Sequence, residues 1–355
     1  MRLGIIGLPQ SGKTTIFNAL TRGDQPTTMG GGRFEVHTSV VDVPDPRVDR
    51  LSAMFNPKKT IYAKVTFADI AGLDGSTGQA GISGQLLNQL TQMDGFLLIV
   101  RVFDDINVPH PAGSVNPQRD LETMMEEFLL NDLIAVERKL ERLEEERKKG
   151  GGRDKAAIQR EKELFEQLHA ALSENKPLRE LVFTSEEEKT LSGFGFLSLK
   201  PILIVPNLAE DQDAVEIDPG AGVAILPLRG KLEMEIAQLP HGEAEMFMEE
   251  YGLEESSLAR MIRMAYQILG VQSFFTVGED EVRAWTVRVG ATAPEAAGVV
   301  HSDLQKGFIR AEVIPYDDLN VLGGMSEARA KGKLRVEGKD YIVKDGEIVH
   351  IRFNI

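Results

Sequence analysis

The 355-residue sequence contains no cysteine. Disulfides, thiolate zinc sites and cysteine nucleophiles are therefore excluded, and the absence fits a reducing compartment. Long apolar runs are also missing, since no segment approaches the roughly 20 apolar residues that a membrane-spanning helix needs. Met1 leads directly into the first predicted strand, so we expect no signal peptide. We therefore expect a cytoplasmic protein with no membrane partner.

Basic charge is in the minority. The formal net charge of −15 argues against nonspecific coating of nucleic acid by the whole molecule, and it leaves room for a local basic face. Hydrophobic residues make up 42% of the chain, which is enough for sizeable cores. Because single cores stop growing near roughly 250–300 residues, this length predicts two or three domains.

The N-terminus carries the strongest motif. Leu3–Ile6 predicts a short buried strand, G-L-P-Q-S-G-K-T follows it from Gly7, and Ile16–Leu20 continues as a helix. This strand, loop and helix are the context that G-x-x-x-x-G-K-[ST] requires. Backbone N–H groups of such a loop surround phosphate oxygens, and the helix dipole adds positive charge. We predict that the phosphate-binding residues are Gly7, Leu8, Pro9, Gln10, Ser11, Gly12, Lys13, Thr14 and Thr15.

The same motif predicts a magnesium site. Lys13 would reach the β- and γ-phosphates, and the Thr14 hydroxyl would be a ligand of Mg²⁺. Asp69 lies near the end of a predicted strand, Lys64–Ile70, and would hold the metal directly or through water. Gly72, in the sequence D-I-A-G, would offer its N–H to the γ-phosphate.

The position after Gly72 bears on hydrolysis. Many GTPases have a glutamine there that orients the attacking water, whereas this chain has Leu73, which cannot donate or accept a hydrogen bond. Another group must then position the water, or intrinsic turnover is slow. His110, in N-V-P-H-P, is the candidate; the alternative is a loop histidine with no catalytic role.

Base selection is expected after the apolar run Pro201–Pro206. Typical GTPases have N-K-x-D at this point, and the aspartate accepts hydrogen bonds from guanine. Here the segment reads Asn207-Leu208-Ala209-Glu210, so the lysine is absent and the carboxylate is longer. This pattern favours ATP over GTP, with Asn207 still able to bond a purine edge; relaxed specificity is the alternative.

Three regions are predicted. Apolar runs such as Gly95–Phe103 alternate with helical segments and predict an α/β fold with a mostly parallel sheet in residues 1–118 and 200–273. Residues 119–199 show heptad spacing on both sides of a glycine triplet and predict an inserted antiparallel coiled-coil hairpin. Residues 274–355 predict a small α+β domain. Basic residues gather at the hairpin tip (Arg147, Lys148, Lys149, Arg153, Lys155) and near the C-terminus around Tyr341 (Arg329, Lys331, Lys333, Arg335, Lys339, Lys344).

With these motifs the chain resembles the Obg-like ATPase family, also called YchF. The resemblance covers nearly the full length. It is carried by the P-loop, V-P-D-P-R, D-I-A-G-L, N-L-A-E and the C-terminal runs F-F-T-V-G, E-V-R-A-W-T and K-G-F-I-R-A-E-V. It implies a C-terminal TGS domain of β-grasp fold, magnesium-dependent hydrolysis of ATP in preference to GTP, and association with ribosomes or RNA through the TGS domain and hairpin. No DNA sequence specificity is expected, and we expect a monomer.

The chain departs from the family pattern around the nucleotide. Gln10 replaces an asparagine associated with a potassium ion, which puts potassium dependence in doubt. Phe34–Ser39 has no threonine in register with the family's switch segment. The last base-contacting loop is predicted at Arg229 and Gly230. Two alternatives therefore stay open: a nucleotide-gated binding module with negligible hydrolysis, and a GTPase.

Overall fold

The computed structural model describes residues 1–23, 36–70, 82, 84–149, 153–250 and 255–354. The chain forms two compact units. The first, here called the nucleotide unit, contains residues 1–39 and 66–258, and the second, the C-terminal unit, contains residues 40–65 and 259–355. These boundaries differ from the predicted ones, because residues 40–65 leave the N-terminal segment and fold with the C-terminal one.

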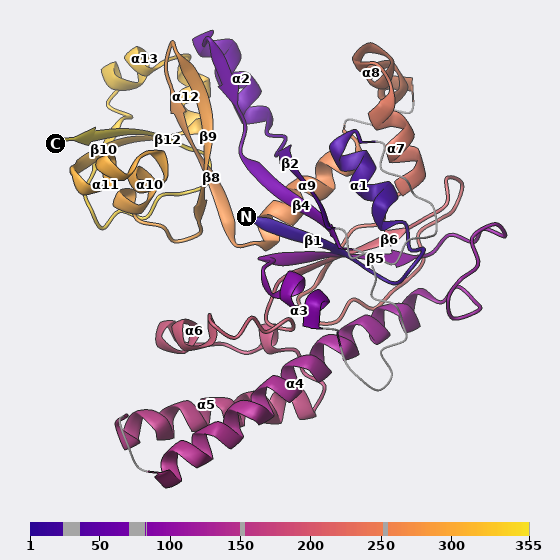
Figure 1. Ribbon diagram of the computed structural model, residues 1–355. Coiled ribbons are helices and arrows are strands. Elements are labelled where there is room, and N and C mark those ends of the chain that lie inside the picture. The colour runs from indigo at the N-terminus through magenta and orange to yellow at the C-terminus, as the bar shows by residue number, and fades with distance from the viewer. Residues whose placement is uncertain (24–35, 71–81, 83, 150–152, 251–254, 355) are drawn as a thin grey trace. The chain divides into compact units, whose positions relative to one another are not determined.

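A six-stranded sheet is the centre of the nucleotide unit (Figure 1). The pairs β1–β4, β1–β5, β5–β6 and β6–β7 are parallel, as the alternation of strands and helices predicts. Every residue of β5 is buried, which explains its continuous apolar sequence. In spatial order the strands are β2 (Val36–Asp42), β4 (Lys64–Ile70), β1 (Arg2–Ile6), β5 (Gly95–Arg101), β6 (Ile202–Asn207) and β7 (Ala224–Ile225).

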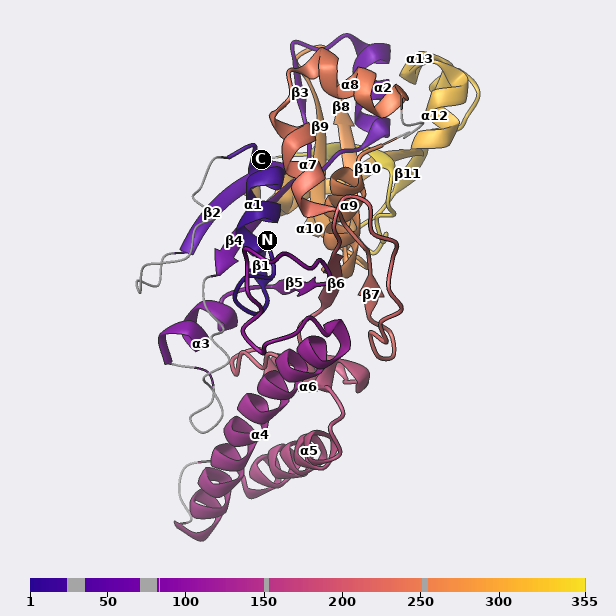
Figure 2. The same cartoon turned by 90° about the vertical axis from the view of Figure 1, so that its right-hand side faces the viewer.

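Helices pack around this sheet. α1 (Lys13–Thr21) follows the P-loop directly and packs against α7 (Gly230–Gln238), as Figure 2 shows. α3 (Gly84–Thr91) buries Leu86 and Leu90 in the sheet core. α8 (His241–Glu250) follows α7. The fold therefore places the start of α1 at the carboxyl end of β1, where open parallel sheets bind ligands.

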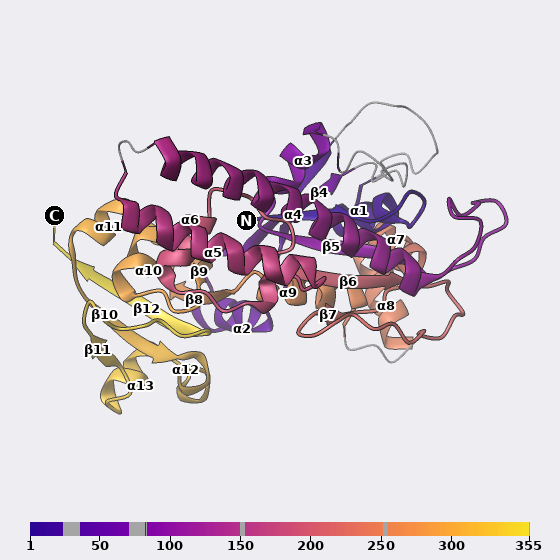
Figure 3. The same ribbon diagram turned by 90° about the horizontal axis from the view of Figure 1, so that it is seen from below.

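The inserted hairpin has the predicted form. α4 (Pro117–Lys149) and α5 (Lys155–Ser173) lie side by side (Figure 3), with a 3₁₀ turn (Leu178–Glu180) and α6 (Ser185–Leu191) completing the insertion. The heptad residues form its core, since Val136, Phe165 and Leu168 are fully buried. Asp132 fastens the return segment, because its buried carboxylate accepts the N–H groups of Leu197 and Ser198 at 2.9 and 2.7 Å.

The C-terminal unit is built on a second six-stranded sheet. Its two central strands, β8 and β12, are parallel, and each has an antiparallel partner, β9 and β10. This is the β-grasp arrangement, with α10 packed on β9 and β10. The strands in spatial order are β11 (Arg335–Glu337), β10 (Phe308–Pro315), β12 (Glu347–Phe353), β8 (Val271–Val277), β9 (Glu281–Arg288) and β3 (Lys59–Ile61); the helices are α2 (Pro46–Phe55), α9 (Ser257–Ile268), α10 (Ala293–Val300), α11 (Ser302–Lys306), α12 (Tyr316–Leu322) and α13 (Met325–Ala330).

The edge strand of this sheet comes from the excursion at residues 40–65. β3 pairs in parallel with β9, so that Lys59 lies opposite Glu281. Arg47 on α2 bonds Asp345 at 2.7 Å and lies over the Phe275 ring. Both predicted architectures, the α/β P-loop fold and the smaller α+β domain, are confirmed. In the part of the chain that is described, no helix is long and apolar enough to cross a bilayer.

Candidate nucleotide site

Two glycines shape the loop between β1 and α1. Gly7 has φ +152°, and a Cβ there would lie 2.4 Å from the Ile99 carbonyl oxygen. Gly12 has φ +94°, and its Cβ would lie 2.1 Å from Asn207 Nδ2. Both positions therefore exclude any side chain. Gln10 also has a positive φ, 62°, and its Oε1 is buried without a hydrogen-bond partner.

Lys13 is folded back onto this loop. Its Nζ donates to the carbonyl oxygens of Gly7 at 3.1 Å and Leu8 at 2.8 Å. The residue is 8% exposed, so the ammonium depends on these acceptors. A phosphate oxygen is a stronger acceptor than a peptide carbonyl. The arrangement therefore holds a cation inside the loop, ready for an anionic ligand.

Thr14 and Asp69 meet beside Lys13. Parallel pairing of β1 and β4 sets Ile5 opposite Asp69, and the Thr14 hydroxyl donates to Asp69 Oδ2 at 2.9 Å. The other carboxylate oxygen, Oδ1, is buried without a partner. Burial raises the pKa of Asp69, against the lowering effects of the Thr14 hydrogen bond and the Lys13 charge. A hydroxyl beside a carboxylate with a spare oxygen fits the oxygen ligands that Mg²⁺ prefers, which phosphate and water would complete.

The predicted base-binding segment is only partly exposed. Asn207 is buried, and its amide joins two loops: Nδ2 donates to the Ser11 carbonyl and Oδ1 accepts the Gly230 N–H, both at 3.0 Å. The side chain of Leu208 packs in the sheet core. Glu210 is exposed after β6, and Arg229 donates to the Gln212 carbonyl at 3.0 Å. Of this set, Glu210 has the freest side chain.

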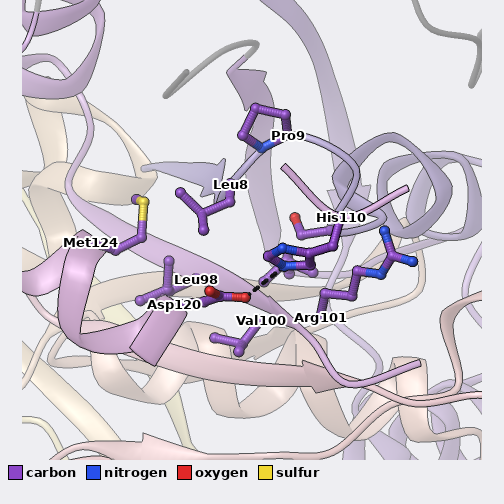
Figure 4. A pocket seen from close by; sticks show the side chains of 10 residues that line it. Leu8, Pro9, Leu98, Val100, Arg101, His110, Asp120 and Met124 are labelled. Atoms are coloured by element: carbon purple, nitrogen blue, oxygen red, sulfur yellow. Dashed lines mark hydrogen bonds and ion pairs between the residues drawn. The ribbon is translucent and has the colours of Figure 1, made fainter. Parts of the chain in front are cut away.

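His110 lies in a small cavity beneath the P-loop (Figure 4). Leu8, Pro9 and Ser11 line one part of this cavity. The imidazole contacts Asp120, with 2.8 Å between Nε2 and Oδ2, and both side chains are at least nine-tenths buried. The structure thus brings His110 to the loop while it directs the ring toward a carboxylate. Gly72 and Leu73 lie outside the described residues.

Two residues near the site belong to no sequence motif and were not predicted. Arg101 ends β5, and its guanidinium donates to the carbonyls of Phe103 and Val108 while Nη1 stays buried without a partner. A lone arginine in the apolar run Gly95–Phe103 is the sequence signal that identifies it. Asp120, in the first turn of α4, resembles an ordinary N-terminal acidic residue, so its contact with His110 had no sequence signal.

Comparison with known proteins agrees with this geometry. Residues 2–139 match a family model described as 50S ribosome-binding GTPase, and residues 271–354 match the YchF-GTPase_C model, described as a protein of unknown function. The chain is 40% identical to the ribosome-binding ATPase YchF of Bacillus subtilis, over 99% of both chains. The chain belongs to the YchF family.

Relatives from eukaryotes extend the match. Obg-like ATPase 1 of Caenorhabditis elegans is 34% identical, with all of this chain and 92% of the relative covered. A solved structure of the Schizosaccharomyces pombe YchF GTPase superposes with a TM-score of 0.85 at 30% identity, covering 99% of this chain and 97% of that one. The predicted family is therefore confirmed.

The two basic regions of this YchF-family chain differ in how their charges are used. At the hairpin tip, Arg147, Lys149 and Arg153 bond glutamates at 2.7–3.1 Å, so their charge is largely neutralised. In the C-terminal unit the exposed basic residues include Lys331, Lys339 and Lys344. Tyr341 is partly buried there and donates to Glu347 at 2.6 Å, beside Arg335.

Proposed function

We propose that this chain is a slow, magnesium-dependent nucleoside triphosphatase that hydrolyses ATP in preference to GTP. The single observation that carries the proposal is the meeting of Lys13, Thr14 and Asp69 at the start of α1. The names of the relatives, which include ribosome-binding ATPases and one GTPase, support a nucleotide substrate of this class.

Catalysis would be electrostatic and positional, without a covalent intermediate. Lys13 would bind the phosphates, and the loop N–H groups would stabilise charge on the transferred phosphoryl group. Thr14 and Asp69 would hold Mg²⁺, which neutralises charge between the phosphates when bound. Gly72 would add an N–H, and His110 would position the water in place of the glutamine that Leu73 replaces.

Preference for ATP rests on the loop after β6. Glu210 is exposed there, one carbon longer than the aspartate that accepts guanine N1–H and its amino group. Asn207 and Gly230 would shape the base pocket through their mutual hydrogen bond, and Arg229 borders it. The side chain of Leu208 packs in the sheet core, so its contribution to the base site would come from the backbone.

The first test titrates Mg-ATP and Mg-GTP side by side against the purified chain, with phosphate release measured in the same samples. Tighter ATP binding with turnover is the expected result. Tighter GTP binding would contradict the base-selection argument.

A nucleotide-gated binding module with negligible hydrolysis is the second candidate function. It is favoured by the contacts of His110, whose two ring nitrogens both have partners. ATP binding without phosphate release, even in single turnover with saturating ribosomes, would establish this alternative.

The partner would be the ribosome or ribosomal RNA, met by a monomer in the cytoplasm. The exposed lysines of the C-terminal unit are the favoured surface, because the hairpin tip pairs most of its cations internally. Binding should weaken with salt, since phosphate contacts release counterions. We expect charge reversal at Lys331, Lys339 and Lys344 to weaken ribosome pelleting more than reversal at Lys148, Lys149 and Lys155.

A further inference from the structure

Both ring nitrogens of His110 have a hydrogen-bond partner. Its Nδ1 accepts the Ala112 N–H at 3.1 Å, and because a backbone N–H can only donate, Nδ1 carries no proton. Nε2 must then carry the proton and donate it to Asp120 Oδ2 at 2.8 Å. The two side chains are 3% and 5% exposed. In this position the ring has no nitrogen left to orient a water molecule.

Asp120 has a second partner besides the neutral imidazole, and this partner is a cation. Arg119 donates to the other carboxylate oxygen, Oδ1, through Nε at 3.0 Å and Nη2 at 2.7 Å. If His110 moves away, the carboxylate keeps a charged partner and is not left alone in a buried site. Removing a lone partner of a buried charge is strongly unfavourable, whereas losing one of two is a much smaller change. His110 is therefore held by a contact that can break.

The backbone on both sides of His110 is tethered separately. Arg101 Nη2 donates to the Val108 carbonyl at 2.7 Å, and Arg119 Nη2 donates to the Ser114 carbonyl at 2.8 Å. Between these tethers Gly113 has φ +79° with open space around it. The short segment that carries His110 can thus change conformation while its two ends stay attached to the fold.

The P-loop lies directly against this histidine. Leu8 and Pro9 line the same cavity as His110 and Asp120 (Figure 4). Ser11 lines it as well. Ser11 Oγ and Arg101 Nη1, which also lie in residues lining it, are buried without hydrogen-bond partners. A change in the P-loop when a triphosphate binds therefore changes the cavity in which the His110 ring lies.

We propose that Asp120 is a positioning residue that holds His110 in a resting place under the P-loop, and that triphosphate binding favours its release. The inference rests on the proposed function, in which His110 positions the water. A triphosphate can shift this equilibrium only by stabilising the released state more than the resting one. The His110–Asp120 contact then sets the low intrinsic rate of hydrolysis.

The test uses Asp120→Asn in the full chain. The variant keeps the side-chain size and converts a charge-assisted hydrogen bond into a neutral one, which is about half as strong. We expect single-turnover ATP hydrolysis to become about fivefold faster. ATP should also bind more tightly, by at most the same factor, because a ligand that favours release binds better where release is easier. Asp104→Asn, at an exposed acid of the same loop, is the matched control and should leave the rate unchanged. An unchanged or slower rate in Asp120→Asn would overturn the proposal.

A double variant and a spectroscopic measurement distinguish two roles of Asp120: holding His110 in place, and merely supporting the fold. Asp120→Asn combined with His110→Ala should be no faster than His110→Ala alone; acceleration without the histidine would overturn the proposal. In the wild-type chain, the ¹⁵N signals of His110, assigned with His110→Ala, should show the Nε2–H form without nucleotide and change on addition of a non-hydrolysable ATP analogue. Signals that do not change would overturn it as well.

These outcomes are distinct from failure of the proposed function. If wild-type protein binds ATP without hydrolysing it, the triphosphatase proposal fails, and the ¹⁵N signals still decide whether nucleotide releases His110.

Discussion

The two units of this chain differ in whether their buried polar atoms have hydrogen-bond partners. In the C-terminal unit, Glu312 bonds Arg352 and Arg329, and Glu347 bonds Arg335, Tyr341 and the Lys344 N–H. In the nucleotide unit, buried polar atoms without hydrogen-bond partners include Gln10 Oε1, Ser11 Oγ, Asp69 Oδ1, Arg101 Nη1, Arg179 Nε and Arg229 Nε. Within the described residues, the C-terminal unit has no such atom.

Most of these unpartnered atoms surround the P-loop. A buried polar group without a partner costs free energy, so a fold keeps one mainly where a ligand will complete it. Among the described residues, the buried polar side chains of the C-terminal unit have partners, whereas the nucleotide unit keeps buried polar atoms that a bound ligand would satisfy. Substitutions of buried polar residues should therefore affect mainly activity in the nucleotide unit and mainly stability in the C-terminal unit.

The largest effect is expected for Lys13→Ala. Loss of the ammonium should lower ATP turnover roughly 1000-fold, because a preorganised charge at the γ-phosphoryl group is removed. The free energy of unfolding should change by less than about 1 kcal/mol, since the carbonyls of Gly7 and Leu8 gain access to water. Phosphate release and chemical denaturation measure the two effects. Near-normal turnover would refute the P-loop assignment, and Lys59→Ala, at an exposed lysine, serves as the control.

Asp69→Asn should impair magnesium-dependent turnover without lowering the stability of the fold. The magnesium concentration for half-maximal ATP turnover should rise roughly 10- to 100-fold. Because burial raises the pKa of Asp69 and so disfavours its charged form, the variant should unfold no more easily than the wild type. Magnesium titrations and urea denaturation test both parts. A clear loss of stability would show that Asp69 is a structural residue.

Glu347→Gln should give the opposite pattern. The C-terminal unit should lose about 1.5 kcal/mol of stability, because the neutral amide cannot satisfy Arg335, Tyr341 and the Lys344 N–H together. ATP affinity should stay the same. Denaturation and nucleotide titration check this, with Asp340→Asn at an exposed position as the control. A change in ATP affinity would break the contrast between the units.

The smallest effect is expected for Glu210→Asp. Shortening this exposed side chain should shift the ratio of GTP to ATP affinity about fivefold toward GTP, roughly 1 kcal/mol. The partner change Leu208→Lys is not useful, because it would bury a charge in the sheet core. Competition titrations measure the ratio. If it does not move, Glu210 does not contact the base.

The elements that the sequence predicted well are local. The P-loop and the strand that ends at Ile70 have motifs or alternation within a dozen residues, and the hairpin has a heptad seam. Leu208 is a residue whose packing local sequence patterns do not predict. Its place after β6 was predicted, whereas the packing of its side chain in the core depends on residues far away in the sequence.

By itself, the sequence determined the P-loop motif, the coiled-coil insertion and the family, since each depends on residue types at short spacing. Only the tertiary structure decided that residues 40–65 belong to the C-terminal unit, that Asn207 joins Ser11 to Gly230, and that His110 is held by Asp120. These contacts join segments whose patterns carry no information about each other. They arise because buried backbone and charged groups must find partners wherever the folded chain places them.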